Sequence, residues 1–558
     1  MPSDRVARGR RWFGGALGTV LLLAGAGLAG TPPLAAAGIP HGGTLTYIDA
    51  PLTPFVKNFN PFSPSYAPGS AELQLFEPLL YFDSYTEKVI PVLATSYRYS
   101  RGDRVITMTL RRGVKWSDGV SFTSADVVFT YEDILKHPAI DLTGVGSDLK
   151  SVSAEGPYKV RFVLKQRDIP FLYYLAGLVP ILPKHIWQGK NPVTFTNPNP
   201  VTTGPFLLEK ITSDEMVLKR NPDYWNRPLP YVSQIDVPMY LSNTTSDLAM
   251  SQGKWSMGQQ FIPDIHTALL AHNPSHYFYW FPPVAPTTLF TNDAVYPTSL
   301  PAFRQALSVA INRNTISSVG EYGYEPPING TGLPLPTFAK WVDPKVVAHY
   351  PDSYSPARAK EILRKAGFKW SPAGKLLTPK GQPVTLTLMA PSGATDYVAD
   401  SEIMVRELQA IGINATATTP SVSTELADLG DGHFQLAILW TSTGPGPYFV
   451  YDTLYNSVYS APVGKVAPSN YERWMNPETD RLLNAYAHTN DPAKEHAIMD
   501  QLEAIVASQL PTIPLVGEVA WDEYNTTQFV GWPTAADPYS AFASEWDYQY
   551  IFARVHER

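Results

Sequence analysis

The sequence contains no cysteine in its 558 residues. This absence excludes disulfide bonds, thiolate metal sites, cysteine nucleophiles and a lipoprotein anchor attached through cysteine. The 11 histidines are scattered, and no pair stands at metal-ligand spacing on an expected helix. Because dedicated transition-metal sites are built from such cysteine and histidine sets, we expect no metal site and no cofactor.

Positive charge and long apolar runs are also scarce. The chain has a formal net charge of −7, and no run of basic residues follows Arg11. General nucleic-acid binders carry a basic patch or stripe, so we expect no nucleic-acid partner. After the N-terminal segment, no stretch is long and apolar enough to span a bilayer.

The motifs of common enzyme classes are missing as well. No G-x-S-x-G, H-E-x-x-H or P-loop pattern occurs, and the single G-x-G-x-x-G match, at residues 25–30, lies in the apolar N-terminal segment rather than between a strand and a helix. Residues 251–254 have the form S-x-x-K, but the companion S-D-N and K-T-G motifs are absent. We therefore predict that the protein is not an enzyme. Carboxylates are plentiful, so an exported polysaccharide hydrolase remains the alternative of another class, and a structural surface protein is a third.

The N-terminus has the pattern of a signal peptide, which we expect to span residues 1–37. Four arginines between residues 5 and 11 precede an apolar stretch at 17–28, and three alanines at 35–37 offer a cleavage site. The twin-arginine match is partial, so general secretion is the default, and an uncleaved anchor is the alternative. We expect a periplasmic or extracellular protein.

The remaining chain is too long for one core, since domains usually have about 100–200 residues. Predicted strands at 384–389 and 434–440 flank a predicted helix at 403–411, and this alternation indicates an α/β architecture. Aromatic residues make up 12% of the chain, and 53 prolines are spread along it. The aromatic side chains either fill large cores or line a pocket for a flat, amphipathic ligand.

The most specific pattern lies at residues 105–136. A predicted strand at 105–110 leads into Leu-Arg-Arg-Gly-Val-Lys-Trp-Ser-Asp-Gly at 110–119, and Thr123 to Asp126 resembles a capping box before a helix. We expect Trp116 in this segment to be a packing residue. The segment resembles the hallmark of the family 5 solute-binding proteins, the extracytoplasmic receptors of ABC importers for oligopeptides, nickel chelates and some oligosaccharides.

The resemblance covers about residues 42–550 and implies a two-lobed periplasmic-binding-protein fold with a hinge, of class II. It implies a first lobe at 38–285 with an inserted subdomain at about 70–195, a second lobe at 286–510 and a return to the first lobe at 511–558. The two crossings are expected near 283–290 and 508–518. The implied partners are an ABC permease with its ATPase subunits, and we expect a monomer.

The loop at 440–449 bears on the ligand. In peptide-binding members of the family, the corresponding loop carries an Asp that pairs with the peptide's amino group. Here the loop has no acid before Asp452. Because a buried ammonium without a carboxylate is costly, we predict an oligosaccharide of the β-glucan type. An oligopeptide or dipeptide remains the alternative if the carboxylate comes from elsewhere, for example Asp293 or Glu518.

Eight residues are the candidate ligand contacts. Trp440 and Tyr448 are the expected stacking platforms, with Thr441 and Ser442 as hydrogen-bonding partners. The other four stand in segments that approach the cleft in the family: Asn60, Gln260, Phe261 and Asn292.

Overall fold

The computed structural model describes residues 38–49, 54–63, 74–441 and 444–558. Residues 40–558 form one compact unit. The predicted signal peptide at 1–37 lies outside the described residues. Among the helices that are described, none combines the length and the apolar character needed to cross a membrane.

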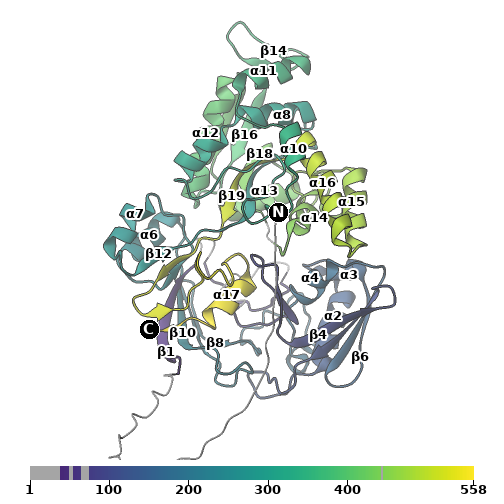
Figure 1. Ribbon diagram of the computed structural model, residues 1–558, viewed down its shortest axis with the longest axis vertical. Coiled ribbons are helices and arrows are strands. Elements are labelled where there is room, and N and C mark those ends of the chain that lie inside the picture. Colours follow the sequence, from purple (N-terminus) through teal and green to yellow (C-terminus); the bar gives the residue numbers. More distant parts are fainter. Residues whose placement is uncertain (1–37, 50–53, 64–73, 442–443) are drawn as a thin grey trace, which may run out of the picture. The chain divides into compact units, whose positions relative to one another are not determined.

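A seven-stranded sheet is built from both ends of the described chain. β1 pairs in parallel with β10 and with β11, and the other pairings are antiparallel. Apolar side chains of β1, β9 and β10 alternate into a buried core that also receives α17. In Figure 1 the C-terminal end lies beside β1. In order across the sheet, the strands are β12 Tyr277–Tyr279, β20 Glu523–Asn525, β11 Met257–Gly258, β1 Gly42–Ile48, β10 Val232–Pro238, β9 Glu215–Arg220 and β8 Phe206–Ile211.

A four-stranded antiparallel sheet follows in the first half of the chain and carries the hallmark segment. It consists of β4 (Ala94–Ser100), β5 (Val105–Leu110), β7 (Lys159–Leu164) and β6 (Leu149–Ala154), in that order. Helix α2 (Ser124–Lys136) begins at the predicted capping box. The Thr123 side chain accepts a hydrogen bond from the Asp126 backbone N–H, and the Asp126 side chain accepts one from the Thr123 backbone N–H. Trp116 is 1% exposed and packs edge-on against Phe122, which confirms its predicted packing role.

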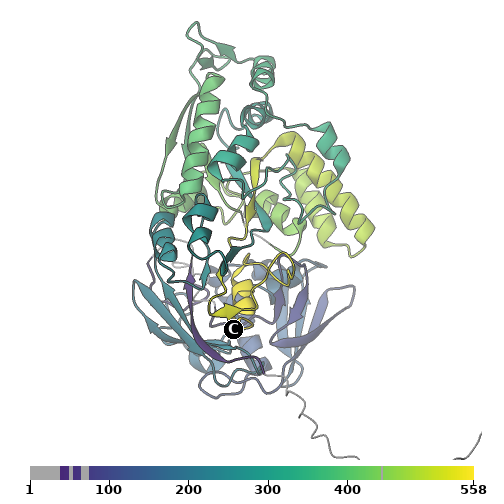
Figure 2. The same cartoon turned by 60° about the vertical axis from the view of Figure 1, so that its left-hand side comes forward.

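The second lobe contains a five-stranded mixed sheet with helices on its faces. β16 pairs in parallel with β17 and β18, and β13 pairs antiparallel with β18 and β19. Figures 1 and 2 show helices along this sheet, where α12 packs against β17 and α8 against β19, and α11 packs against α8. The strands are, in order, β17 Asn414–Thr418, β16 Thr385–Met389, β18 Leu436–Leu439, β13 Pro283–Thr291 and β19 Thr512–Val519. The main helices are α8 Pro301–Ala310, α11 Pro356–Lys365, α12 Thr395–Ala410, α14 Pro447–Tyr455, α15 Pro477–Ala487 and α16 Pro492–Gln509.

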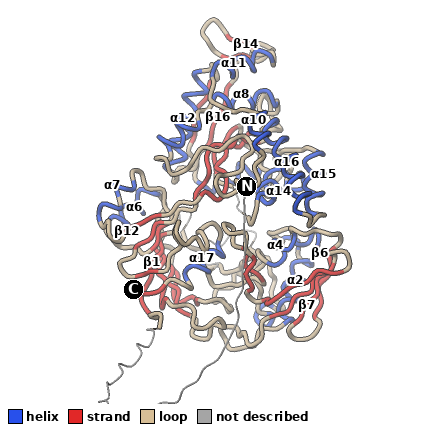
Figure 3. Tube along the Cα trace, viewed as in Figure 1, coloured by secondary structure: helices blue, strands red, loops and turns tan. Residues whose placement is uncertain are grey.

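Short elements complete the fold, and Figure 3 shows how loops join them. In the first lobe they are β2 Leu80–Phe82, β3 Val89–Pro91, η1 Pro138–Ile140, α3 Val145–Asp148, α4 Phe171–Ala176, α5 Lys184–Trp187, α6 Asn243–Ser251, α7 Ile265–Ala268, η2 Leu270–His272, β21 Phe529–Val530, α17 Glu545–Phe552 and β22 His556–Glu557. In the second lobe they are α9 Arg313–Thr315, the π-helical η3 Ile316–Gly320, α10 Pro344–His349, β14 Lys369–Trp370, β15 Leu376–Leu377, α13 Val422–Asp431 and η4 Ser457–Tyr459.

Two short segments connect the two large sheets. Tyr279 pairs with Glu523 in the seven-stranded sheet, whereas Pro283 pairs with Val519 in the five-stranded sheet. The chain therefore leaves one sheet and enters the other at 280–282 and at 520–522. The two segments are bonded to each other, since the Trp280 N–H donates to the Asp522 carbonyl (2.9 Å) and the Ala520 N–H donates to the Pro282 carbonyl (2.9 Å). This arrangement matches the expected α/β fold with two lobes.

Candidate ligand pocket

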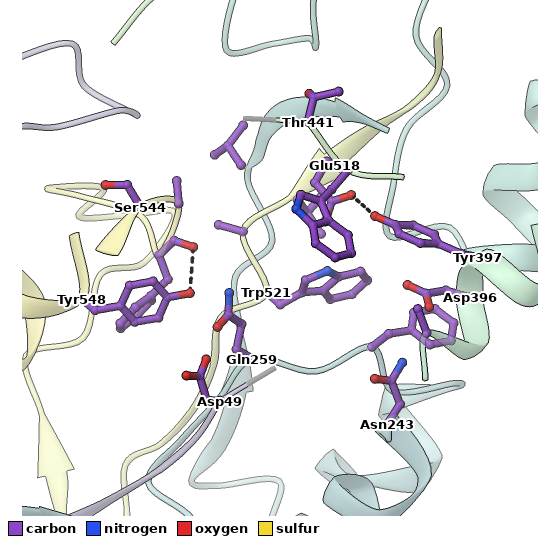
Figure 4. A pocket seen from close by; sticks show the side chains of 18 of the residues that line it. Asp49, Asn243, Gln259, Asp396, Tyr397, Thr441, Glu518, Trp521, Ser544 and Tyr548 are labelled. Atoms are coloured by element: carbon purple, nitrogen blue, oxygen red, sulfur yellow. Dashed lines mark hydrogen bonds between the residues drawn. The ribbon is translucent and has the colours of Figure 1, made fainter. Parts of the chain in front are cut away.

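A pocket of about 1180 Å³, part of it open to solvent, lies against the second crossing segment. Its wall combines residues that follow strands of the seven-stranded sheet with residues of the second lobe (Figure 4). Asp49 follows β1, and Gln259 and Phe261 follow β11. From the second lobe, Asp396 and Tyr397 come from the first turn of α12, and Trp440 follows β18.

Aromatic side chains form much of the pocket wall. Trp440 and Tyr397 lie nearly parallel, with ring centroids 6.3 Å apart and an interplanar angle of 27°. Phe261 meets Trp521 edge-on at 5.7 Å. Such rings offer flat apolar faces to a ligand that has both apolar and polar edges. The aromatic lining residues are Phe261, Tyr397, Trp440, Trp521, Phe542 and Tyr548.

Glu518 is a pocket carboxylate that is held by hydrogen bonds from two hydroxyl groups. Its Oε2 atom accepts hydrogen bonds from the Tyr397 hydroxyl (2.5 Å) and from Thr287 Oγ1 (2.6 Å). Burial raises the pKa of Glu518, and these hydrogen bonds oppose that shift. Thr287 Oγ1 also lies 3.1 Å from Glu325 Oε2. Glu325 is also buried, and burial together with the nearby Glu518 carboxylate raises the pKa of Glu325 well above its ordinary value.

Asp396 is the least-satisfied carboxylate of the pocket. Its side chain is 5% exposed, and its Oδ1 atom has no hydrogen-bond partner in the described part of the chain. Burial raises its pKa to about 7, and the nearby Glu518 carboxylate adds to the shift. In Figure 4 the carboxylate of Asp396 faces the space bordered by Trp521. A ligand group that donates a hydrogen bond there would relieve the cost of burying this carboxyl group.

The pocket is acidic. Asp49, Asp396 and Glu518 line it, and no Lys, Arg or His is found among the described lining residues. The other polar lining groups are amides and hydroxyls: Asn243, Gln259, Thr441 and Ser544. No three His, Asp or Glu side chains of the described residues are arranged to hold a metal ion. The pocket is therefore suited to ligands that donate hydrogen bonds, and it offers no cation to an anionic ligand.

The structure brings three of the predicted contacts together in this pocket, namely Phe261, Trp440 and Thr441. A fourth, Gln260, lies directly behind the wall: its Nε2 donates to the Asp49 carbonyl (2.8 Å) and its Oε1 accepts from Ser246 Oγ (2.5 Å). Gln260 thus fixes the backbone that carries a lining residue. Ser442 lies outside the described residues.

Three predicted contacts are not among the lining residues. Asn60 donates to the Pro192 carbonyl (2.7 Å), and Asn292 donates to the carbonyls of Gly432 and Phe434 (2.9 and 3.0 Å), so both amides are used to hold backbone. Tyr448 is buried and stacks on Tyr486, with ring centroids 4.7 Å apart. The two asparagines therefore hold backbone segments in place, and Tyr448 packs α14 against α15.

Asp293 and Glu518, the two carboxylates considered as partners for a peptide's amino group, lie in different parts of the structure. Glu518 lines the pocket, whereas Asp293 is buried in the second lobe and pairs with Arg304 (3.2 Å). Asp396, Tyr397 and Trp521 were not predicted as ligand contacts. A signal for the first two existed: α12 follows the parallel strand β16, and ligands of α/β sheets bind where helices begin after such strands.

The two lobes also touch away from the pocket. The Ile169 N–H donates to the Ala487 carbonyl (2.9 Å), and the Tyr174 hydroxyl donates to Asp452 Oδ2 (2.8 Å). On the pocket side, Asn243 of α6 reaches the Thr395 hydroxyl (3.4 Å). The structure therefore has first-lobe and second-lobe residues in contact on both sides of the pocket.

Comparison with known proteins agrees with this architecture. The family model of the bacterial extracellular solute-binding proteins, family 5, matches residues 88–461. The glutathione-binding protein GsiB of Salmonella choleraesuis is 27% identical over 456 residues, which cover 79% of this chain and 83% of GsiB. The nickel-binding periplasmic protein of Escherichia coli is 28% identical over 415 residues, covering 72% of this chain and 76% of that protein.

Solved structures show the same fold. A mannohexaose-bound periplasmic oligopeptide-binding protein of an ABC transporter from Thermotoga maritima superposes with a TM-score of 0.85 at 28% identity, covering 92% of this chain and 98% of that one. The oligopeptide-binding protein AppA from Bacillus subtilis, in complex with a nonapeptide, gives a TM-score of 0.78 at 21% identity, covering 93% and 100%.

Proposed function

Because this chain belongs to the bacterial extracellular solute-binding proteins of family 5, we propose that it is the receptor of an ABC importer for a neutral, β-linked oligosaccharide. The observation that carries the proposal is the pocket lining, which combines six aromatic residues with carboxylates, amides and hydroxyls and contains no described basic side chain. Sugar rings present apolar faces for stacking and hydroxyl edges for hydrogen bonds, and this lining complements both.

A relative supports the same ligand class. The protein from Thermotoga maritima has mannohexaose bound, and this chain is similar to it at 28% identity, with 92% of this chain covered. Mannohexaose and cello-oligosaccharides are both neutral chains of hexoses. We therefore take β-glucan fragments as the first class to test and mannan fragments as the second.

A short peptide is the second candidate, and one observation favours it. Asp396 and Glu518 provide carboxylates for an amino terminus, so the acid missing from the 440–449 loop is available from other elements. The opposing observation is that a peptide short enough to fit entirely in the pocket also buries its own carboxylate. A carboxylate without a cationic partner is costly to bury, and the described lining has none.

We propose that ligand capture involves hinge motion at 280–282 and 520–522. We place the boundaries between the lobes at these two segments, and not at 283–290 and 508–518 as expected from the sequence. Residues 283–291 and 512–519 are strands of one sheet and move together. Segments of a few residues between rigid sheets are the usual place for a domain hinge. The closed form would present a surface to the permease and its ATPase subunits, with the receptor acting as a monomer.

We further propose that the mature protein is exported and begins near Gly38. Intact-mass measurement of the secreted protein is expected to give a chain that starts within a few residues of this position. Recovery of the full-length chain from the cytoplasm would contradict export.

Calorimetric titration of the mature protein with cellohexaose, mannohexaose and tri- to pentapeptides tests the ligand class. We expect a saturable heat with at least one hexasaccharide and none with the peptides. Chromatography of the ligand after prolonged incubation is expected to return it unaltered, and its shortening would favour the hydrolase alternative instead. Tight peptide binding with no heat from any sugar would refute the oligosaccharide proposal.

A further inference from the structure

Asp396 is a buried acid that faces the pocket and has no counter-charge. It is 5% exposed, its Oδ1 has no hydrogen-bond partner in the described ranges, and none of the ion pairs between described residues includes it. The Asp396 carboxylate accepts hydrogen bonds from the backbone N–H groups of Asp396 and Tyr397, whereas its neighbour Glu518 accepts hydrogen bonds from the side chains of Thr287 and Tyr397. Among the carboxylates that line the pocket, Asp396 is therefore the one with an oxygen that lacks a hydrogen-bond donor in the described ranges.

Several other buried acids, from four different parts of the chain, lie near Asp396. The groups that interact with it electrostatically are Asp247 of α6, Glu321 and Glu325 after η3, Asp400 of α12 and Glu518 of β19. None of them takes part in a described ion pair with Lys, Arg or His. Because burial raises the pKa of these acids, carboxyl groups of the cluster hold protons when the pocket is empty, and a cation beside them favours loss of a proton.

The walls near Asp396 suit an ammonium on a sugar more than a metal ion. Tyr397 follows Asp396 in the chain, and Trp440 lies nearly parallel to Tyr397. Trp521 borders the same space in Figure 4. Aromatic faces attract ammonium groups through their quadrupole and also stack against sugar rings. The described residues offer no three-ligand set for a metal.

We infer that Asp396 forms a subsite for an ammonium group, so that the preferred ligands are amino-sugar oligosaccharides such as β-1,4-linked glucosamine oligomers. This inference rests on the proposed function as a receptor for β-linked oligosaccharides, and it changes the preferred ligand from a neutral to a cationic member of that class. The ammonium donates to Asp396 Oδ1 and lies against the aromatic faces, while the hydroxyl groups meet the neutral part of the lining. Acidic sugars are excluded because the described lining has no cation for them.

Proton release accompanies this capture. Burial raises the pKa of Asp396 to about 7, so in the empty pocket at pH 6 the group is mostly protonated. An adjacent ammonium stabilises the ionised form and lowers that pKa, and the proton leaves for the buffer. Binding of a neutral oligosaccharide brings no charge and releases no proton from this group.

Cellohexaose and glucosamine hexaose form a matched test, because both are β-1,4-linked hexamers and differ only at the 2-position. Titration of the mature protein at pH 6 is expected to show at least tenfold tighter binding of glucosamine hexaose. The heat for that ligand alone is expected to change with the ionisation enthalpy of the buffer, in the direction of proton release. N-acetylated glucosamine hexaose, which lacks the charge, is expected to lose the preference.

Two variants separate the subsite from a general charge effect. Asp396→Asn is expected to reduce the glucosamine-to-cellohexaose affinity ratio to below threefold and to abolish the buffer dependence. The control Glu402→Gln removes an acid that is 63% exposed on the same helix and is expected to leave the ratio unchanged. Melting curves verify that both variants are folded, and the N-acetylated ligand tests the inference without any variant.

The outcomes are distinguishable. Equal affinity for the two hexamers, or a preference that survives Asp396→Asn, overturns the ammonium subsite and leaves the oligosaccharide function standing. Absence of binding by glucosamine, glucose and mannose hexamers alike overturns the proposed function itself.

Discussion

Asp168 is a partly buried acid at the contact between the two lobes, and its ionisation is expected to make the stability of the protein depend on pH. It stands between Arg167, whose guanidinium donates to the His488 carbonyl of the second lobe (2.8 Å), and Ile169, whose N–H donates to the Ala487 carbonyl (2.9 Å). Burial raises the pKa of Asp168 to about 7, and the carboxylates of Asp148 and Asp452 add to the shift. The substitution Asp168→Asn removes the charge and keeps an oxygen to accept the hydrogen bond of the Phe171 N–H (2.9 Å).

The sign follows from proton linkage. The folded protein holds the Asp168 proton up to about pH 7, whereas the unfolded chain releases it near the ordinary value of 3.8. Between these values the folded state binds more protons, so the free energy of unfolding falls as pH rises. A shift from 3.8 to about 7 corresponds to at most about 4 kcal/mol, at about 1.4 kcal/mol per pKa unit. Asp168 is only partly buried, so water screening reduces the expected loss to roughly 1–2 kcal/mol.

Urea unfolding of the wild type and of Asp168→Asn at pH 4, 6 and 8 measures this effect. We expect the variant to equal the wild type at pH 4 and to be more stable by roughly 1–2 kcal/mol at pH 8. The control Asp223→Asn removes a carboxylate whose side chain is 79% exposed and is expected to change stability by less than about 0.5 kcal/mol at each pH. A variant that is less stable than the wild type at pH 8 would refute this reasoning.

Three further substitutions have separable effects. Trp440→Ala is expected to weaken oligosaccharide binding at least tenfold with an unchanged circular dichroism spectrum, and loss of folding instead would identify a core residue. Tyr174→Phe removes a hydroxyl that donates to Asp452 (2.8 Å), so we expect a larger radius of gyration in the absence of ligand, and an unchanged radius would contradict a closing contact. Trp116→Ala is expected to lower the free energy of unfolding by about 3–5 kcal/mol without changing ligand affinity, as calorimetry can check.

Local elements were predictable because their signals lie within a few residues. The strand predicted at 105–110 is β5, and the capping box at Thr123 begins α2. Ser355 caps α11 through the Arg358 N–H, as its position before a proline indicates. In each case the hydrogen-bond partner is a near neighbour in sequence, so composition and spacing are sufficient.

The pocket was only partly predictable, because its members are chosen by contacts between distant segments. The helix expected at 403–411 begins at Thr395, and the turn that was missed contains Asp396. Ala394, which precedes this helix, provides no side-chain cap, so the sequence carries no capping signal there. Asn60 and Tyr448 have side-chain types suited to ligand contact, but long-range packing directs them to backbone and core partners.

The structure of the mature protein crystallised with cellohexaose or mannohexaose tests the central claim most directly. We predict that the hexasaccharide lies between the lobes, with sugar rings stacked on Trp440 or Trp521 and hydroxyl groups within hydrogen-bond distance of Asp396 and Thr441. A hexasaccharide bound elsewhere, or a pocket that stays empty at saturating sugar and fills only with a peptide, would contradict it.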